Sequence, residues 1–159
     1  MSALPYSETE IFNKVRQILQ ASELEVLQLV PPGGQAPFSL TYLDEELGRK
    51  RTVYPDLIAR NDNYVFVGEM KPRYSREDLI KLTSISASDQ AINDIIRLSH
   101  APPSVNFLFA LIHSQSGPPN TGDIYQIVFS ESGCVVHQNE DEIEAVDPFL
   151  NILNNLTSN

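Results

Sequence analysis

The spacing of apolar residues predicts a helix followed by a series of strands in the first half of the chain. Residues 7–20 place apolar side chains on one helical face, and Ser7 with Glu10 forms the Ser-x-x-Glu capping pattern that begins many helices. Short apolar runs separated by turns rich in Pro, Gly and Asn follow, and each run is typical of a strand. These runs are residues 24–30, 38–43, 52–60 and 64–71, with a polar turn at 44–51 and a hairpin turn at 61–63.

The second half of the chain starts with another helical pattern. Ser75 and Asp78 repeat the capping pattern, and the apolar spacing predicts a helix to about Leu98 with a break near residues 84–88. Residues 105–113 are nearly all apolar, which predicts a strand buried on both faces. A hairpin at 124–130 and 133–138, an acidic loop at 140–144 and a helix at 147–156 complete the chain. This order of elements predicts an α/β fold in which helices flank a mixed sheet.

Composition limits the class of protein. The 159 residues are expected to form a single domain, 1–159. No stretch approaches the roughly 18 apolar residues of a membrane span, and the N-terminal residues lack the basic and apolar regions of a signal peptide, so we expect a cytoplasmic protein without a membrane partner. A single cysteine, Cys134, excludes an intramolecular disulfide and a cysteine-based zinc cluster, and it is expected to be a small buried hydrophobe.

Charge is distributed unevenly along the chain. The net charge of −10 argues against a nucleic-acid partner, because phosphate contacts need Lys and Arg. However, eight of the eleven basic residues lie between positions 49 and 81, where only five acids accompany them. After Arg97 there is no Lys or Arg, and seven acids follow. The basic window therefore keeps a nucleic-acid partner open, whereas the acidic remainder is typical of a solvated surface.

Two carboxylates are predicted to meet at one end of the sheet. If strands 52–60 and 64–71 are antiparallel neighbours, Asp56 and Glu69 approach each other, and such a pair repels itself unless a cation lies between the two carboxylates. Mg²⁺ suits one or two carboxylates, and the carbonyl of Met70 could add a neutral oxygen ligand. Lys71 lies two residues after Glu69 and therefore on the same side of the strand, where it could orient or help to deprotonate an attacking water. The alternatives are solvent-exposed or Arg-paired acids and a lysine that protects an edge strand.

The first helix offers a third carboxylate. At 100° per residue, Glu8 lies near the centre of the apolar arc of helix 7–20, whereas Glu10 points roughly the opposite way and is explained by the capping pattern. A carboxylate that faces the body of the protein is costly without a partner. Glu8 is therefore the candidate for a third metal ligand.

Pro55-Asp56 followed by Glu69-Met70-Lys71 resembles the PD-(D/E)xK nuclease superfamily of restriction-endonuclease-like folds. The order of elements over residues 7–113 is also similar to that of the superfamily. The resemblance implies an αβββαβ core, here with extra C-terminal strands and a helix, and Mg²⁺- or Mn²⁺-dependent cleavage of nucleic acid, with DNA favoured. It implies catalytic roles for Asp56, Glu69 and Lys71 and metal binding by Glu8, Asp56 and Glu69. Some members add a Gln from the following helix, here Gln90.

Substrate and partner expectations complete the hypothesis. Basic residues near the motif are candidate phosphate contacts, although those at 49–51 are explained equally well as a solvated hairpin tip. The nucleic-acid-binding candidates are Arg49, Lys50, Arg51, Arg73, Arg76 and Gln90. We expect such a nuclease to form a homodimer or to be a subunit of a larger complex. The alternative is a catalytically inactive protein that keeps this fold as a protein-binding or assembly module, which the net charge and the acidic C-terminal third favour.

Overall fold

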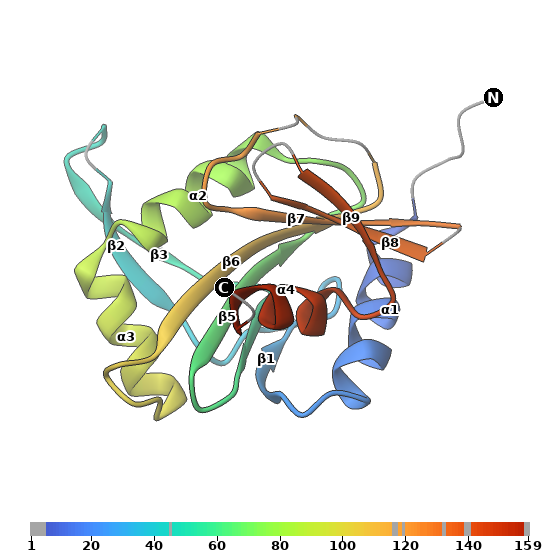
Figure 1. Cartoon of the computed structure of the whole chain (residues 1–159). Coiled ribbons are helices and arrows are strands. Elements are labelled where there is room, and N and C mark those ends of the chain that lie inside the picture. Colours follow the sequence, from blue (N-terminus) through green and yellow to red (C-terminus); the bar gives the residue numbers. More distant parts are fainter. Residues whose placement is uncertain are drawn as a thin grey trace.

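The protein is built on a seven-stranded mixed sheet with helices on both faces (Figure 1). The computed structural model describes residues 6–44, 46–115, 118, 120–131, 133–138 and 141–157. Strand order in the sheet is β1-β4-β5-β6-β7-β8-β9, and β2 and β3 form a separate two-stranded sheet. The strands are β1 (Glu25–Leu29), β2 (Leu40–Asp44), β3 (Arg49–Val53), β4 (Leu57–Arg60), β5 (Tyr64–Met70), β6 (Asn106–His113), β7 (Tyr125–Ser130), β8 (Gly133–Gln138) and β9 (Asp141–Ala145). The helices are α1 (Glu8–Gln20), α2 (Arg76–Ser86), α3 (Asp89–Ser99) and α4 (Pro148–Thr157).

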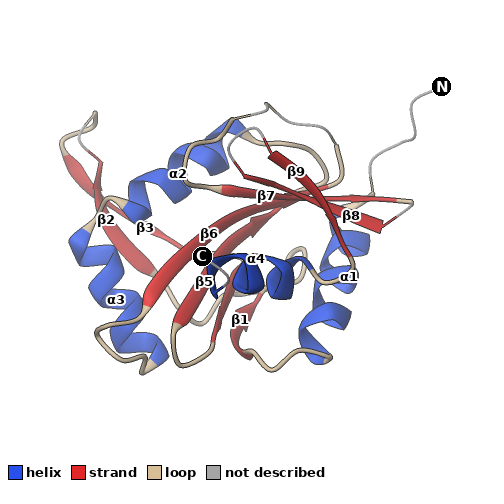
Figure 2. Ribbon diagram, in the orientation of Figure 1, coloured by secondary structure: helices blue, strands red, loops and turns tan. Residues whose placement is uncertain are grey.

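The sheet separates two apolar cores, because side chains alternate between its faces. On one face α1 and α4 pack against residues such as Phe66 and Met70 of β5. On the other face α2, α3 and the β2–β3 sheet cover Val65 and Val67. Figure 2 shows these two helices and two strands together on one side of the molecule. Glu69 alternates with Met70 and therefore points to the face that α2 covers.

Strand directions place the candidate site. β1, β4 and β5 are antiparallel neighbours, and β6 lies parallel to β5 after the α2–α3 crossover. β6 is buried on both faces, with Leu108 in one core and Phe109 in the other, which confirms the prediction for residues 105–113. The break in the second helical region is also confirmed: Ala87 ends α2, and the Ser88 side chain accepts a hydrogen bond from the N–H of Ala91 to begin α3.

The predicted strand at 52–60 is wrong. Residues 49–53 form β3, which pairs with β2, and residues 57–60 form β4, which pairs with β1 and β5. Pro55 lies between them and has no N–H to donate to a ladder, so the chain can leave one sheet and enter the other here. The predicted turn at 44–51 is correspondingly too long. Arg49, Lys50 and Arg51 lie along β3 rather than at a hairpin tip, opposite Asp44, Leu43 and Tyr42.

The predicted acidic loop is wrong in its described part. Asp141–Ala145 forms β9, the edge strand that pairs antiparallel with β8, and Glu140 lies outside the described residues. The ladder to β8 satisfies the backbone of this segment, and charged side chains are common on edge strands because they discourage further pairing.

The β7–β8 hairpin and the final helix are confirmed. The Asp147 side chain accepts hydrogen bonds from the N–H groups of Phe149 and Leu150 at the start of α4. Among the described residues, no helix combines the length and apolar character that crossing a membrane requires.

Candidate functional site

Asp56 and Glu69 lie side by side at the end of the β4–β5 ladder. The antiparallel pairing predicted from the sequence is confirmed, and its last pair, Leu57 with Gly68, places Asp56 opposite Glu69. The N–H of Asp56 donates to Oε2 of Glu69 at 3.3 Å, and the N–H of Met70 donates to Oδ2 of Asp56 at 2.9 Å. Each carboxylate thus accepts a hydrogen bond from a backbone N–H on the other side of the hairpin, and these two bonds hold the side chains together.

Gln28 on β1 fixes the backbone at Asp56. Its side chain is 3% exposed, its Nε2 donates to the carbonyl of Pro55 at 2.6 Å, and its Oε1 accepts from the N–H of Phe38 at 2.7 Å. The carbonyl of Asp56 accepts from the N–H of Val30 at 2.9 Å. Sequence reasoning did not identify Gln28, because a polar residue on an apparent edge strand carries no signal of this contact.

Glu69 is a buried carboxyl beside a like charge. Its side chain is 2% exposed, and its Oε1 forms an ion pair with the Lys81 ammonium of α2. Burial, together with the hydrogen bond and charge of Asp56, raises the pKa of Glu69, while the charge of Lys81 and its contact with Oε1 lower it. The Asp56–Glu69 pair therefore favours any additional positive charge that can reach it.

Lys71 lies just beyond β5, among four carboxylates. Burial acts to lower the pKa of Lys71, but the charges of Asp78, Asp56, Glu8 and Glu69 together outweigh it and raise the pKa. Lys71 is thus an ammonium ion at neutral pH. It can orient a water or a phosphate oxygen by donating hydrogen bonds, but it has no free lone pair with which to remove a proton.

The start of α1 is fastened to the segment that follows Lys71. The N–H of Tyr6 donates to Oγ of Ser114 at 2.7 Å, and Oγ of Ser114 donates to the carbonyl of Pro72 at 2.8 Å. The N–H of Ser114 reaches the same carbonyl at 3.1 Å. These bonds bring Glu8 to the end of β5 that carries Lys71, where the charge of Glu8 acts on Lys71. Ser114 itself carried no signal in the sequence.

Asp78 and Lys81 are members of the site that sequence reasoning missed. Asp78 is 9% exposed, and its Oδ2 has no hydrogen-bond partner among the described residues. Burial raises the pKa of Asp78, against the charges of Lys71 and Lys81. The cap that its N–H forms with Oγ of Ser75 at 3.2 Å gives this residue a sufficient local explanation in the sequence. Helical spacing, which puts Lys81 three residues after Asp78 on the same side of α2, was the available signal.

The residues predicted to contact nucleic acid are spread over β3, the start of α2 with the loop before it, and α3. Arg73 and Arg76 are exposed between β5 and the first turn of α2. Arg49, Lys50 and Arg51 are exposed on β3, five to seven residues before Asp56, and Arg51 forms an ion pair with Asp44 at 3.4 Å. Gln90 is exposed near the start of α3, and within the described part of the chain no hydrogen bond joins it to Asp56 or Glu69.

The donor set suits a hard divalent cation held by few protein ligands. Asp56 and Glu69 supply two adjacent carboxylates, and the N–H of Met70 points at Asp56, so its carbonyl lies along the same edge of β5. Mg²⁺ and Mn²⁺ prefer such oxygen ligands, and Mg²⁺ keeps several waters. No three Asp, Glu, His or Cys side chains of the described residues are grouped as metal ligands, so Glu8 does not join the two motif acids around one point.

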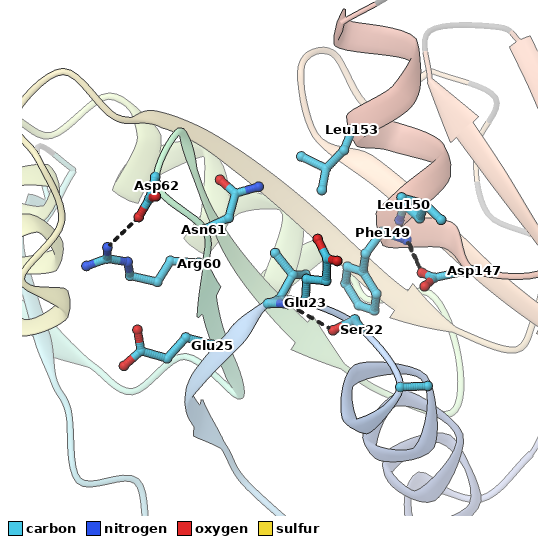
Figure 3. A pocket seen from close by; sticks show the side chains of 12 residues that line it. Ser22, Glu23, Glu25, Arg60, Asn61, Asp62, Asp147, Phe149, Leu150 and Leu153 are labelled. Carbon is cyan, nitrogen blue, oxygen red and sulfur yellow. Dashed lines mark hydrogen bonds and ion pairs between the residues drawn. The ribbon is translucent and has the colours of Figure 1, made fainter.

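A separate cavity lies at the opposite end of β5. It has a volume of about 610 Å³ and is lined by residues that include Arg60, Asn61 and Asp62 of the β4–β5 turn and Phe149 of α4 (Figure 3). Arg60 forms an ion pair with Asp62 at 3.6 Å and donates to the carbonyl of Ser99 at 2.7 Å. The seven residues of β5 separate this cavity from the carboxylate pair, so it is not part of the candidate site.

Comparison with known proteins leaves the chain without an assigned relative. No protein-family model matches it. Neither the curated proteins nor the solved structures include a significant match. The functional argument therefore rests on the geometry of Asp56, Glu69, Lys71 and their neighbours.

Proposed function

We propose that the protein is a divalent-metal-dependent nuclease of the PD-(D/E)xK type that hydrolyses phosphodiester bonds in nucleic acid, with DNA the favoured substrate. The observation that carries this proposal is the carboxylate pair Asp56–Glu69 at the end of two antiparallel strands, in which Glu69 is buried and Asp56 half-buried, followed by Lys71 on the same side of β5. A buried carboxyl held against a second carboxylate is costly for a purely structural role and suits a site that binds a cation.

The order of elements supports the restriction-endonuclease-like part of the proposal. α1 precedes the antiparallel strands β1, β4 and β5, the α2–α3 region crosses over, and β6 returns parallel to β5. This corresponds to an αβββαβ core in which the β2–β3 sheet is an insertion between the first two core strands. Strands β7–β9 and helix α4 are then additions after the core.

Each residue of the site has a role in this scheme. Asp56 and Glu69, with the carbonyl of Met70, would hold Mg²⁺ or Mn²⁺. When bound, such an ion supplies Lewis-acid stabilisation of the charge that develops on the phosphate. The Lys71 ammonium donates hydrogen bonds that orient the attacking water or a phosphate oxygen, and Glu8 helps to keep Lys71 charged.

Cleavage of a substrate panel tests the proposal. Labelled single-stranded DNA, duplex DNA, single-stranded RNA and duplex RNA are incubated with the native protein and Mn²⁺ or Mg²⁺, and each is compared with EDTA-treated samples. Asp56→Asn and Lys71→Met are expected to abolish cleavage, whereas Asp62→Asn, at the other end of the β4–β5 hairpin, retains it. Cleavage that survives in Asp56→Asn and Lys71→Met would contradict the assignment of the site.

A second candidate function is a non-catalytic module that binds a protein partner. The specific observation in its favour is the Lys81–Glu69 ion pair, which already gives the buried carboxylate a positive partner without a metal ion. The exposed acidic residues of β9 would then face the partner. A native protein that neither binds Mn²⁺ nor cleaves any member of the panel would favour this function. Size-exclusion chromatography with light scattering tests the homodimer or larger complex expected for either function.

A further inference from the structure

The Lys81 ammonium lies where a cation would contact Glu69. Lys81 comes from α2, its side chain is 23% exposed, and Nζ forms an ion pair with Oε1 of Glu69. Nζ also lies 3.5 Å from the carbonyl of Tyr54, two residues before Asp56. Because Oε2 of Glu69 already accepts the N–H of Asp56, Oε1 is the oxygen left for a metal ion, and Lys81 covers it.

A divalent ion at this position therefore requires Lys81 to move. An ammonium group and a metal ion cannot occupy the same side of Oε1, and two positive charges in contact repel each other. Lysine has a flexible four-carbon stem with a compact charge, so its ammonium can change partners without movement of the helix backbone. Once it leaves Glu69, the Lys81 ammonium needs another carboxylate as its partner.

Asp78 offers a second carboxylate within reach of Lys81. It precedes Lys81 by three residues, so the two side chains are neighbours on the surface of α2. Asp78 is 9% exposed, and its Oδ2 has no hydrogen-bond partner among the described residues. A buried carboxylate oxygen is normally satisfied, so one without a partner points to a group that arrives in another state. The charges of Lys71 and Lys81 both act on Asp78, and of these two only Lys81 lies on the same helix as Asp78.

We propose that Lys81 exchanges between two partners: it neutralises Glu69 in the metal-free protein and moves to Oδ2 of Asp78 when a divalent ion binds Asp56 and Glu69. This inference rests on the metal site proposed above. Lys81 and Asp78 are positioning residues, because neither needs to touch the substrate. The exchange gives Glu69 a positive partner in both states, Lys81 without the metal and the ion with it, so that Glu69 can remain buried without a permanently bound metal.

A double-mutant cycle on Mn²⁺ binding tests the exchange. Calorimetry compares the native protein with Asp78→Asn, Lys81→Met and the double variant. If Asp78 acts by receiving Lys81, Asp78→Asn weakens Mn²⁺ binding at least about tenfold in the native background and has less than about a threefold effect in the Lys81→Met background. Glu77→Gln, an exposed residue in the same turn of α2, removes the same charge and is the matched control, with less than about a threefold effect.

The outcomes separate the exchange from the metal site itself. If the native protein binds Mn²⁺ and Glu69→Gln abolishes binding, the metal site is supported. An Asp78→Asn effect of equal size in both backgrounds then overturns the exchange alone. If the native protein does not bind Mn²⁺, or Glu69→Gln binds it equally well, both the metal site and the exchange are overturned.

A measurement on the native protein does not depend on the folding of any Asp78 variant. In protein with ¹³C-labelled lysine, the Lys81 side-chain NMR signal is assigned by its loss in Lys81→Met. We expect this signal to shift on saturation with diamagnetic Mg²⁺, while the exposed Lys50 on β3 does not shift. A Lys81 signal that is unchanged by saturating Mg²⁺ would overturn the exchange.

Discussion

Asp56 and Glu69 are joined by a backbone-to-carboxylate hydrogen bond just beyond the last pair of the β4–β5 ladder, where the N–H of Asp56 donates to Oε2 of Glu69 at 3.3 Å. The next N–H along β5, that of Met70, returns a bond to Oδ2 of Asp56 at 2.9 Å. The two carboxylates therefore serve as hydrogen-bond partners for a strand end and as a concentrated negative charge. The two hydrogen bonds that position the carboxylates therefore also restrict the movement of both side chains.

Lys81→Met is expected to destabilise the metal-free protein. The substitution keeps the length of the side chain but leaves the buried Glu69 carboxyl without its cationic partner. Breaking a partly exposed pair of this kind should lower the free energy of unfolding by about 1–3 kcal/mol. Urea denaturation without metal measures the loss. The double variant Glu69→Gln with Lys81→Met should be more stable than Lys81→Met alone. Equal stability of the two variants would show that the Lys81–Glu69 ion pair does not contribute to the stability of the protein.

Gln28→Leu is expected to lower both the stability of the protein and its affinity for Mn²⁺. The substitution removes the donor to the carbonyl of Pro55 and the acceptor of the N–H of Phe38, which are both left in a largely buried setting. We expect a loss of about 2–3 kcal/mol in the free energy of unfolding and weaker Mn²⁺ binding, because Asp56 follows Pro55 directly. Gln20→Leu, on the exposed end of α1, is the matched control and should change neither quantity. Native Mn²⁺ affinity in Gln28→Leu would show that Asp56 does not depend on this contact.

His113 should make the protein less stable in mild acid. It is 1% exposed; the N–H of Gln115 donates to its Nδ1 at 3.3 Å, and its Nε2 therefore donates to Oε1 of Gln126 at 3.0 Å. Burial and, to a smaller extent, the charge of His137 lower the pKa of His113, against the hydrogen bonds that the ring forms with Gln126 and Gln115. The unfolded chain takes up a proton at a higher pH than the folded protein does, so the contribution of this histidine is complete above about pH 6.5 and is lost as the pH falls towards its folded pKa.

Denaturation curves of native protein and His113→Gln across this pH range measure the effect. The stability difference between the two proteins should shrink as the pH falls below about 6.5, because only the native protein loses the histidine contribution. A difference that is constant with pH would contradict the neutral state of His113.

The carboxylate pair could be predicted from the sequence because local signals fix it. The turn at 61–63 and the apolar runs on either side determine an antiparallel hairpin, and its register brings Asp56 to Glu69. Alternation along β5 then puts Lys71 beside Glu69. No tertiary information is needed for these steps.

The rest of the site depends on how distant segments pack. Asp78 and Lys81 reach the pair because α2 crosses over β5, and each has an adequate local explanation as a capping-turn acid or a surface lysine. Ser114 joins α1 to the end of β5 through a contact between residues 108 positions apart. The division of residues 52–60 between two sheets likewise depends on packing of the β2–β3 sheet against α2 and α3, which the apolar pattern alone does not specify.

Mn²⁺ binding to the metal-free protein, measured by calorimetry, tests the central claim most directly because it requires no knowledge of the substrate. The native protein is expected to bind with a dissociation constant in the micromolar-to-millimolar range, and Asp56→Asn or Glu69→Gln should abolish binding. Glu142→Gln, an exposed acid on β9, removes the same charge at the far edge of the sheet and should bind like the native protein. Binding that is indifferent to both site substitutions, or no binding by the native protein even with nucleic acid present, would contradict the metal-dependent nuclease.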